Sequence, residues 1–476
     1  MDLRMDKVDR ISALPEGILQ HIISFLSFKQ AVQTSTLSKI WKQAWLTYPI
    51  LNVDRTDKDP ERRRVILTYL GQTLLKRDME MISITKLVLK MELTSYEASY
   101  IEQSLQYAVR GCKLELQSRV NLPSLRNLSL AQIDASDQVI DYVVSGCPLI
   151  EFLRIDDCLE LKSLKLFNLD KLKKIKVSFN EKLERVEINA SNVHSLSITY
   201  TVTPCWINVV LCKNLKQLKL WSLSITDEWL CNEISELLLL EYLDVACCMN
   251  LESILISSSR LKTLFIGGCI NLVEAKIEAP SLSAFSYQGD MISFSFNALA
   301  LSEVDLYFYT DDSDAEWLFK FIEALAKFHQ FSEVINLKID SIEHMLVPRA
   351  LRQTLMPPLS GTKHLNFRNS YACLRFPIME VVDSLLWISP HLETLSIEIG
   401  SRNKIFLQFS YNNPVIYEGE TPRCCQSRPI SCWQHCMKKI EIEHTKNYIG
   451  EVINRYSFVE EEILEMLEKI DAALLI

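Results

Sequence analysis

One pattern of apolar positions returns throughout the middle of the chain: an apolar residue, two residues of any kind, a second apolar residue, one residue of any kind, and a third apolar residue. A clear copy is Leu125, Leu128 and Leu130. The alternation in its second half is typical of a half-buried β-strand. Successive copies start 19 to 25 residues apart, mostly 21 to 25, which predicts a region built from repeated strand units. The copies begin at Leu125, Ile150, Leu172, Val193, Leu215, Leu240, Leu261, Leu282 and Leu301.

A cysteine that returns at one place in the pattern identifies the type of repeat. Cys158, Cys248 and Cys269 each stand three residues after the last apolar position, and the copies at 248–268 and 269–289 align without a gap. This period and this cysteine are typical of leucine-rich repeats, so a curved solenoid of short repeats is predicted. A β-sandwich with evenly spaced strands is the alternative. The cysteine register and the gapless copies favour the solenoid.

A second, offset series of alternating segments lies between the main copies. Each member starts 11 residues after a main copy. We therefore expect the convex side of several repeats to carry short extended segments rather than helices. A worn first repeat is expected at Ile84, Leu87 and Leu89, and longer repeats with helices, such as 316–328, are expected after Leu306. The offset segments are 161–166, 183–188, 251–256 and 272–277, and a further helix is expected around 96–109.

The residues between the apolar positions are predicted to line the concave face of the solenoid, because side chains alternate across a strand. Aromatic side chains beside lysines on a rigid face are typical of a surface that binds protein. The alternative is that they are scattered surface residues, which every protein has. The candidate target-binding residues are Lys174, Lys176, Lys219, Trp221, Tyr242 and Phe265.

The first 50 residues follow a different, helical period. Apolar residues recur at every fourth position from Leu14 to Leu26, and Pro15 suits the first turn of a helix. A second amphipathic stretch, 29–44, carries Leu37, Ile40 and Trp41. About 40 residues are too few to bury this much apolar surface alone, so part of it is expected to meet a partner helix. The alternative is an N-terminal cap that packs on the repeats.

The stretch DRISALPEGILQHIISFLSFKQAVQTSTLSKIWKQAW closely resembles an F-box. The resemblance includes the leucine–proline pair, the ISFL block at 23–26, and the closing serine, basic residue and tryptophan. F-boxes dock on the Skp adaptor of Skp–cullin–F-box ubiquitin ligases. The pattern leaves open which apolar residues face the adaptor and which face the module's own core. The resemblance implies an adaptor-binding set of Leu14, Pro15, Ile18, Ile22, Leu26 and Trp41.

The remainder of the chain resembles the plant F-box/leucine-rich-repeat family whose members often end in an FBD domain. The segment 432–470 is similar to that terminal domain, with a strand expected at 437–442 and then a helix. The resemblance implies a mixed α/β chain of four parts. These are a small all-helical F-box at 8–54, a linker and lead-in segment at 55–83, the repeat array at 84–430, and an FBD-like segment at 431–476.

Charge and cysteine spacing exclude several classes. The formal charge of −9 argues against nucleic acid or an anionic membrane as a partner. The 14 cysteines include no CxxC pair, which argues against zinc modules and redox pairs, and the group Cys425, Cys432, His435 and Cys436 lacks a second pair of ligands. With neither a signal peptide nor an apolar run of about 18 residues visible, the nucleus or cytoplasm is expected rather than secretion.

No residue pattern points to covalent chemistry. The chain has no serine nucleophile elbow, no glycine-rich phosphate loop and no HExxH sequence. We therefore expect no catalytic residue, metal or cofactor. The resemblance implies a substrate-recognition subunit that binds the Skp adaptor, through it a cullin, and an unknown target protein. The alternatives are a binding scaffold or a small-molecule sensor without ligase function.

Overall fold

The computed structural model describes residues 11, 14–54, 60–80, 82–90, 122–133, 136–201, 204–310, 316–329, 333–352, 354–369, 378–400, 403–409, 437–446 and 451–459. The chain divides into two compact units, Met1–Ile225 and Thr226–Ile476, and each is described by itself. The helix expected around 96–109 lies outside the described residues.

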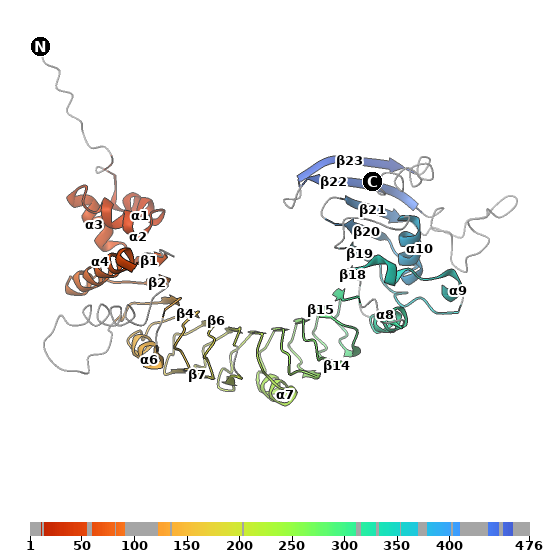
Figure 1. The fold of residues 1–476 in the computed structure, drawn as a ribbon, viewed down its shortest axis with the longest axis horizontal. Coiled ribbons are helices and arrows are strands. Elements are labelled where there is room, and N and C mark those ends of the chain that lie inside the picture. The colour runs from red at the N-terminus through yellow and green to blue at the C-terminus, as the bar shows by residue number, and fades with distance from the viewer. Residues whose placement is uncertain are drawn as a thin grey trace, which may run out of the picture. The chain divides into compact units, whose positions relative to one another are not determined.

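The first unit begins with the helices α1 (Glu16–Ser24), α2 (Phe28–Thr34) and α3 (Lys39–Thr47) (Figure 1). Ser27 forms a capping box with Gln30 at the start of α2, and the Ser38 side chain accepts the Trp41 N–H at the start of α3. These caps explain why one short apolar stretch folds as separate helices. Their buried residues are Leu19, Ile23, Phe28, Ala31, Trp41, Ala44, Trp45 and Leu46.

A long parallel sheet follows in the first unit. Its strands pair without any offset, so that Leu128, Leu153 and Ile175 stand side by side. The predicted repeats are confirmed, including the worn first repeat with its buried Leu87 and Leu89. The strands, in order across the sheet, are β1 (Ile50–Asp54), β2 (Lys86–Lys90), β3 (Asn127–Ala131), β4 (Phe152–Asp156), β6 (Lys174–Ser178), β8 (Ser195–Thr199) and β10 (Gln217–Trp221).

The offset series forms a second parallel sheet of β5 (Ser163–Phe167), β7 (Arg185–Asn189) and β9 (Trp206–Asn208). Its apolar residues, such as Leu164 and Val186, are as fully buried as those of the main sheet. Each of these repeats is thus a flattened coil with one short strand on either side of a shared core. The expectation of extended segments opposite the main strands is confirmed for 161–166 and 183–188.

Helices cover one edge of each short sheet. α6 (Asp137–Ser145) places Asp137 so that its carboxylate accepts the backbone N–H groups of Lys162 and Ser163, at 2.7 and 3.0 Å. In the second unit, Asp227 does the same for Glu252 and Ser253, at 3.1 and 2.9 Å. A carboxylate at the start of a helix therefore occupies backbone groups that an open sheet edge would present to another chain.

The second unit repeats this plan and then changes it. Strands β11 to β20 pair in parallel, and β21, β22 and β23 continue the sheet antiparallel. The main strands are β11 (Tyr242–Ala246), β13 (Thr263–Gly267), β15 (Ala284–Gly289), β17 (Glu303–Phe308), β18 (Val334–Ile339), β19 (His364–Asn369), β20 (Thr394–Ile399), β21 (Asn403–Phe409), β22 (Met437–Lys446) and β23 (Glu451–Val459).

The other side of the second unit passes from strands to helices, as expected. The short sheet of β12 (Ser253–Ser257), β14 (Glu274–Glu278) and β16 (Ser293–Asn297) confirms the offset segments 251–256 and 272–277. After this sheet, helices replace the short strands, because the later repeats are longer. These helices are α8 (Trp317–Ala326), η1 (Ile342–Met345), α9 (Arg349–Arg352) and α10 (Ile378–Ile388), whereas α7 (Asp227–Glu236) precedes the sheet.

Two features differ from the sequence-based expectations. The segment expected to be a linker contains a 20-residue helix, α4 (Pro60–Met79), with a buried stripe of Ile66, Leu70 and Leu74. Near the C-terminus, the expected short strand extends to Lys446 and is followed by a second strand, β23, where a helix was expected. Residues 460–476 lie outside the described residues.

Arg77 of α4 joins this helix to the helical module. Its side chain is fully buried and donates to the carbonyls of Trp45 and Tyr48, at 2.7 and 2.6 Å. The guanidinium carbon also lies 5.2 Å from the centre of the Trp45 ring. Burial lowers the pKa of Arg77 to about 10, which leaves it charged at neutral pH. A cation therefore binds the carbonyl groups at the C-terminal end of α3.

We predict that Arg77→Met lowers the free energy of unfolding by about 2–4 kcal/mol, because two buried carbonyls lose their donors. Urea unfolding followed by circular dichroism measures this loss. The control is the neighbouring Lys76→Met, which removes only an exposed ion pair with Glu80 and is expected to cost less than about 0.5 kcal/mol. Equal stability of the two variants would show that the carbonyl contacts contribute nothing.

Candidate functional site

Several large apolar side chains of the helical module are exposed. Phe25 is 76% exposed and Leu37 is 69% exposed, and Ile11, Ile18 and Ile40 are about half exposed. Five large, exposed apolar side chains on a module of about 40 residues indicate a protein-interaction site. We name it the module surface, defined by Ile11, Ile18, Phe25, Leu37 and Ile40.

The predicted adaptor-binding residues divide into three groups in the structure. Pro15 and Ile18 are exposed, whereas Leu14, Ile22 and Leu26 are half-buried. Trp41 is only 5% exposed and belongs to the module's own core, so its prediction as a surface contact is wrong. The physical reason is the third helix: Ser38 caps its start, and the turn that follows carries Trp41 inward, toward the core.

Phe25, Leu37 and Ile40 were not among the predicted contacts. Phe25 follows the last residue of α1, and Leu37 precedes the Ser38 cap of α3. A helical period places residues on faces only within a helix, so it gives no position to residues at helix ends. The sequence signal that could have identified Phe25 and Leu37 as exposed contacts is that both are large apolar residues close to helix-capping residues.

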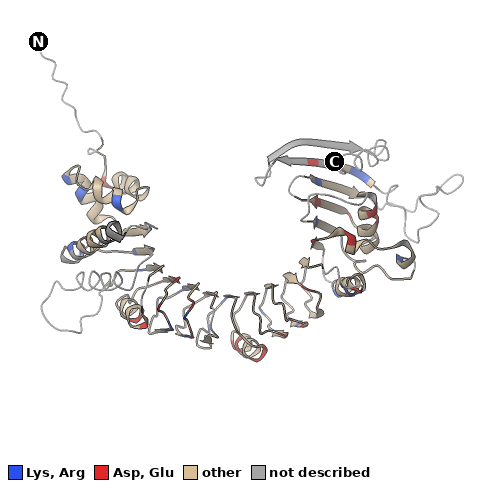
Figure 2. Ribbon diagram, in the orientation of Figure 1, with Lys and Arg blue, Asp and Glu red and all other residues tan. Residues whose placement is uncertain are grey.

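A second candidate surface is the open face of the main sheet in the first unit. The one-to-one register places Arg154, Lys176, Ser197 and Lys219 in one row across β4, β6, β8 and β10. Lys174 precedes this row by two residues on the same face, and Figure 2 colours the basic positions of these strands blue. The structure therefore brings three of the predicted target-binding lysines onto one face of the sheet, on β6 and β10 with β8 between them.

The lysines of β6 differ from the other basic residues of this face. Arg154 forms an ion pair with Asp156 at 2.5 Å. Arg126 and Lys173 both form ion pairs with Glu151, at 2.5 and 2.6 Å. Lys174 and Lys176 are exposed, and in the part of the chain that the structure describes neither ammonium group is paired with a carboxylate. Their positive charge is thus open to a partner.

Aromatic side chains follow one end of the same strands. Phe179 and Tyr200 stack with ring centroids 4.5 Å apart and an interplanar angle of 12°, and they are 51% and 45% exposed. Trp221, at the end of β10, is also exposed, and the Lys219 ammonium lies 5.9 Å from the centre of its ring. We name Phe179, Tyr200 and Trp221 the aromatic column. Trp221 was predicted, whereas Phe179 and Tyr200 were missed because they stand after the strand pattern.

Tyr242 and Phe265, the predicted residues of the second unit, are half-buried on its main sheet. The Tyr242 hydroxyl donates to Asp244 at 3.1 Å. A Cβ atom at Gly267 would lie 2.6 Å from Cζ of Phe265, so the Phe265 ring lies across that glycine. Both rings are thus occupied by contacts within their own strand, and less of their surface is open to a partner than in the aromatic column.

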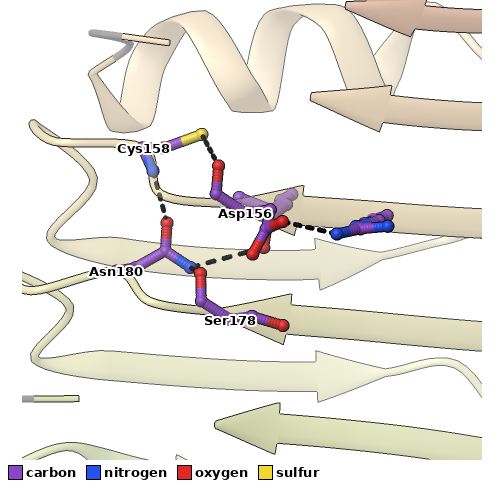
Figure 3. Close-up of polar contacts among 6 residues, drawn as sticks. Asp156, Cys158, Ser178 and Asn180 are labelled. Carbon is purple, nitrogen blue, oxygen red and sulfur yellow. Dashed lines mark hydrogen bonds and ion pairs between the residues drawn. The ribbon is translucent and has the colours of Figure 1, made fainter. Parts of the chain in front are cut away.

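The residues at the consensus cysteine position of the repeat connect neighbouring coils through hydrogen bonds. The Asn180 side chain accepts the Cys158 backbone N–H at 2.9 Å and donates to the Ser178 carbonyl at 2.9 Å (Figure 3). Cys158 is fully buried, and burial raises the pKa of its thiol to about 12. A thiol with such a pKa is a poor nucleophile at neutral pH.

The other consensus cysteines are also buried, as predicted. Cys248 is fully buried, and Cys269 is nearly so. A hydrogen bond with Cys248 lowers the pKa of the Cys269 thiol. Among the described residues, no group of three or more histidine, cysteine, aspartate or glutamate side chains could hold a metal ion. The cluster Cys425, Cys432, His435 and Cys436 lies outside the described residues.

A parallel array of two-stranded coils preceded by a three-helix module defines a leucine-rich-repeat protein with an F-box. Comparison with known families supports both parts. The F-box domain family matches residues 11–52, and the family described as "At1g61320/AtMIF1, LRR domain" matches residues 93–204 and 200–445. The second family covers well over half of the chain, and the chain belongs to it.

Similar proteins come from Arabidopsis thaliana. F-box/LRR-repeat protein At3g03360 is 25% identical over 312 residues, which are 58% of this chain and 64% of that protein. F-box/LRR-repeat protein At5g02910 is 30% identical over 241 residues, 42% of this chain and 50% of its own length. F-box/LRR-repeat protein 25 is 26% identical over 237 residues, 41% of this chain and 88% of its length. The chain thus spans between half and two thirds of the first two relatives.

The helices within the described ranges include none that is long and apolar enough to cross a membrane.

His194 lies close enough to the lysines of β6 for their charges to change its pKa. Burial, and then the charges of Lys174, Lys173 and Lys216, lower its pKa below the ordinary histidine value. One of these lysines, Lys173, is paired with Glu151. The folded protein therefore takes up this proton less readily than the unfolded chain does.

We predict that stability falls as pH drops below about 6.5, where the unfolded chain gains the His194 proton first. His194→Gln removes this dependence and is expected to flatten the curve of unfolding free energy against pH between about 7 and 5. Urea unfolding at a series of pH values measures it. His21→Gln, at an exposed histidine of α1, is the control; an unchanged curve for His194→Gln would contradict the assignment.

Proposed function

We propose that this chain is a substrate-recognition subunit of a Skp–cullin–F-box ubiquitin ligase. The helical module binds a Skp adaptor, which connects it to a cullin, and the repeat array binds a target protein. The observation that carries this proposal is the module surface, whose most exposed residues are Phe25 and Leu37. An apolar surface on a module of about 40 residues is best explained by a partner that covers it.

The proposed contribution to ubiquitin transfer is proximity. A target held on the array and an adaptor held on the module raise the effective concentration of the target near the transfer enzyme. No residue of this chain takes part in the chemistry, in keeping with burial that raises the pKa of Cys147, Cys158 and Cys205 to about 12. Arg77 supports such a role because it ties the module to α4, the helix that leads into the array.

The proposal extends to the parts of the chain and its location. The F-box occupies 8–54, a lead-in segment that includes α4 occupies 55–83, the array 84–430, and an FBD-like segment 431–476. The strand β22, which begins at Met437 and pairs with β21, supports a strand at the start of that last segment. A ligase subunit of this kind acts in the nucleus or cytoplasm.

The half-buried Leu14, Ile22 and Leu26 and the exposed Pro15 belong to the same proposed adaptor contact as Ile18 of the module surface. Truncation of residues at the centre of such a contact typically costs more than about 1 kcal/mol of binding, whereas residues outside it cost little. Exposed residues are the best choice for a test because their replacement leaves the core unchanged.

We predict that Ile18→Ser with Phe25→Ser reduces capture of a purified plant Skp adaptor by at least about tenfold. A pull-down with the full chain measures capture, and circular dichroism checks that the variant is folded. The matched control is Leu299→Ser, at an equally exposed leucine of the second unit. If the wild-type chain captures no adaptor, or if the double variant captures as much as the wild type, the adaptor role is wrong.

The receptor role has its own test. A ligase reconstituted with adaptor, cullin and this chain is expected to transfer ubiquitin to proteins that bind the array. The same ligase with the Ile18→Ser, Phe25→Ser chain is expected to leave those proteins unmodified. Adaptor binding without any gain of ubiquitin on array-bound proteins would refute the receptor role and retain the adaptor contact.

A further inference from the structure

We propose that the open face of β4, β6, β8 and β10, together with the aromatic column, binds an acidic peptide segment that carries an aromatic or large apolar side chain. The site is defined by Lys174, Lys176 and Lys219 and by Phe179, Tyr200 and Trp221. The inference rests on the proposed function, since it names the chemical class of the target that the array receives.

The first argument is charge. The chain as a whole has a formal charge of −9, yet the basic positions on this face are Arg154, Lys174, Lys176 and Lys219, and the carboxylate beside them, Asp156, is held by Arg154. Lys174 and Lys176 are exposed without a carboxylate partner among the described residues. A cationic island on an acidic protein attracts carboxylates and repels basic segments.

The second argument is the choice of residue at the turn. Phe179 and Tyr200 have φ angles of 56° and 58°, in the left-handed region that bulky side chains rarely adopt. The corresponding place in neighbouring repeats, one residue after each strand, is also left-handed and holds Gln132, Asp157, Ser222, Cys247 and Gly268. The turn therefore does not require an aromatic residue, yet two successive repeats of the first unit carry one there. This choice favours a role for the two exposed rings.

The third argument is the arrangement of the rings. They stack on each other in the open, half exposed, rather than packing into the core. The Tyr200 N–H donates to the Trp221 carbonyl at 2.8 Å, so the third ring stands on the adjacent backbone. Exposed aromatic side chains that are rigidly held are the usual anchors of protein interfaces, and a flat apolar group can stack on them.

The fourth argument is scale. Neighbouring strands lie about 4.8 Å apart, so β6 and β10, two strands apart, are separated by about 10 Å. Along β6, the three residues from Lys176 to Phe179 also span about 10 Å. The lysines and rings therefore form a patch that a short segment of about four to six residues covers with its acidic and aromatic side chains together.

Nucleic acid shares the chemistry of negative charge and stacking, but the observations favour a peptide. A polyanion needs many basic contacts to overcome repulsion from an acidic chain, whereas a few carboxylates need only two or three. A peptide offers both groups with little charge.

The test is a display library of random peptides of about twelve residues, selected on the full chain without adaptor. We expect enrichment of Asp or Glu together with Trp, Tyr or Phe. Fluorescence anisotropy with an enriched peptide is then expected to show binding about tenfold or more weaker for Lys174→Glu with Lys176→Glu. Lys165→Glu, an exposed lysine on the short sheet of the same unit, is the matched control and is expected to bind like the wild type.

A second pair of variants separates binding from folding. Phe179→Gly and Tyr200→Gly relieve the left-handed strain, so their thermal unfolding temperatures are expected to stay close to that of the wild type while peptide affinity falls about tenfold. A structural role for these rings would instead lower the unfolding temperature and leave affinity unchanged.

Three results would overturn the inference: enrichment of basic or purely apolar peptides, equal binding by the charge-reversed chain, or tighter binding of a labelled oligothymidine than of the enriched peptide. Adaptor capture is measured on the same preparations. Loss of peptide selection with intact adaptor capture refutes only this inference, whereas loss of adaptor capture with intact peptide binding refutes the ligase role.

Discussion

The in-register pairing of parallel strands is the constraint on which the array depends. Because each main strand pairs with the next without offset, one position of the repeat forms one row of the sheet. Apolar positions then stack into a continuous core, and the intervening positions stack into rows on the open face. Lys176 and Lys219 lie in one row for this reason, although 43 residues separate them. A change in register by one residue would exchange core and surface along a whole strand.

The same constraint sets the turn that follows each strand. In successive repeats one left-handed residue turns the chain while its N–H continues the hydrogen-bond ladder, as Phe179 does to the Thr199 carbonyl at 2.9 Å. The neighbouring coil holds this backbone on the other side, so a bulky residue is tolerated where an isolated turn would reject it. The repeats therefore provide positions at which a strained, exposed side chain is held firmly, and the aromatic column uses two of them.

One edge of each short sheet and the junction with the module are closed by charged groups that bind backbone. Asp137 and Asp227 accept N–H groups at sheet edges, and Arg77 donates to carbonyls at the end of α3. A repeat array has no natural end, because each coil leaves its last backbone groups unpaired. Long-range polar contacts of this kind terminate the sheets and attach the module. The apolar repeat pattern does not specify either of these features.

The apolar pattern by itself determined the repeats, their period, both series of strands and the helical nature of the module, because burial on one face leaves a period in the sequence. The family resemblance added the F-box. Only the tertiary structure decided which module residues are open: Trp41 lies inside and Phe25 outside, since the packing of three helices, not the period of one, sets burial. It also decided that α4 is a helix whose Arg77 is buried, and that Phe179 and Tyr200 stack beside the lysines of β6. These depend on contacts between residues far apart in sequence or on turn residues outside any period, and a local pattern carries no information about such contacts.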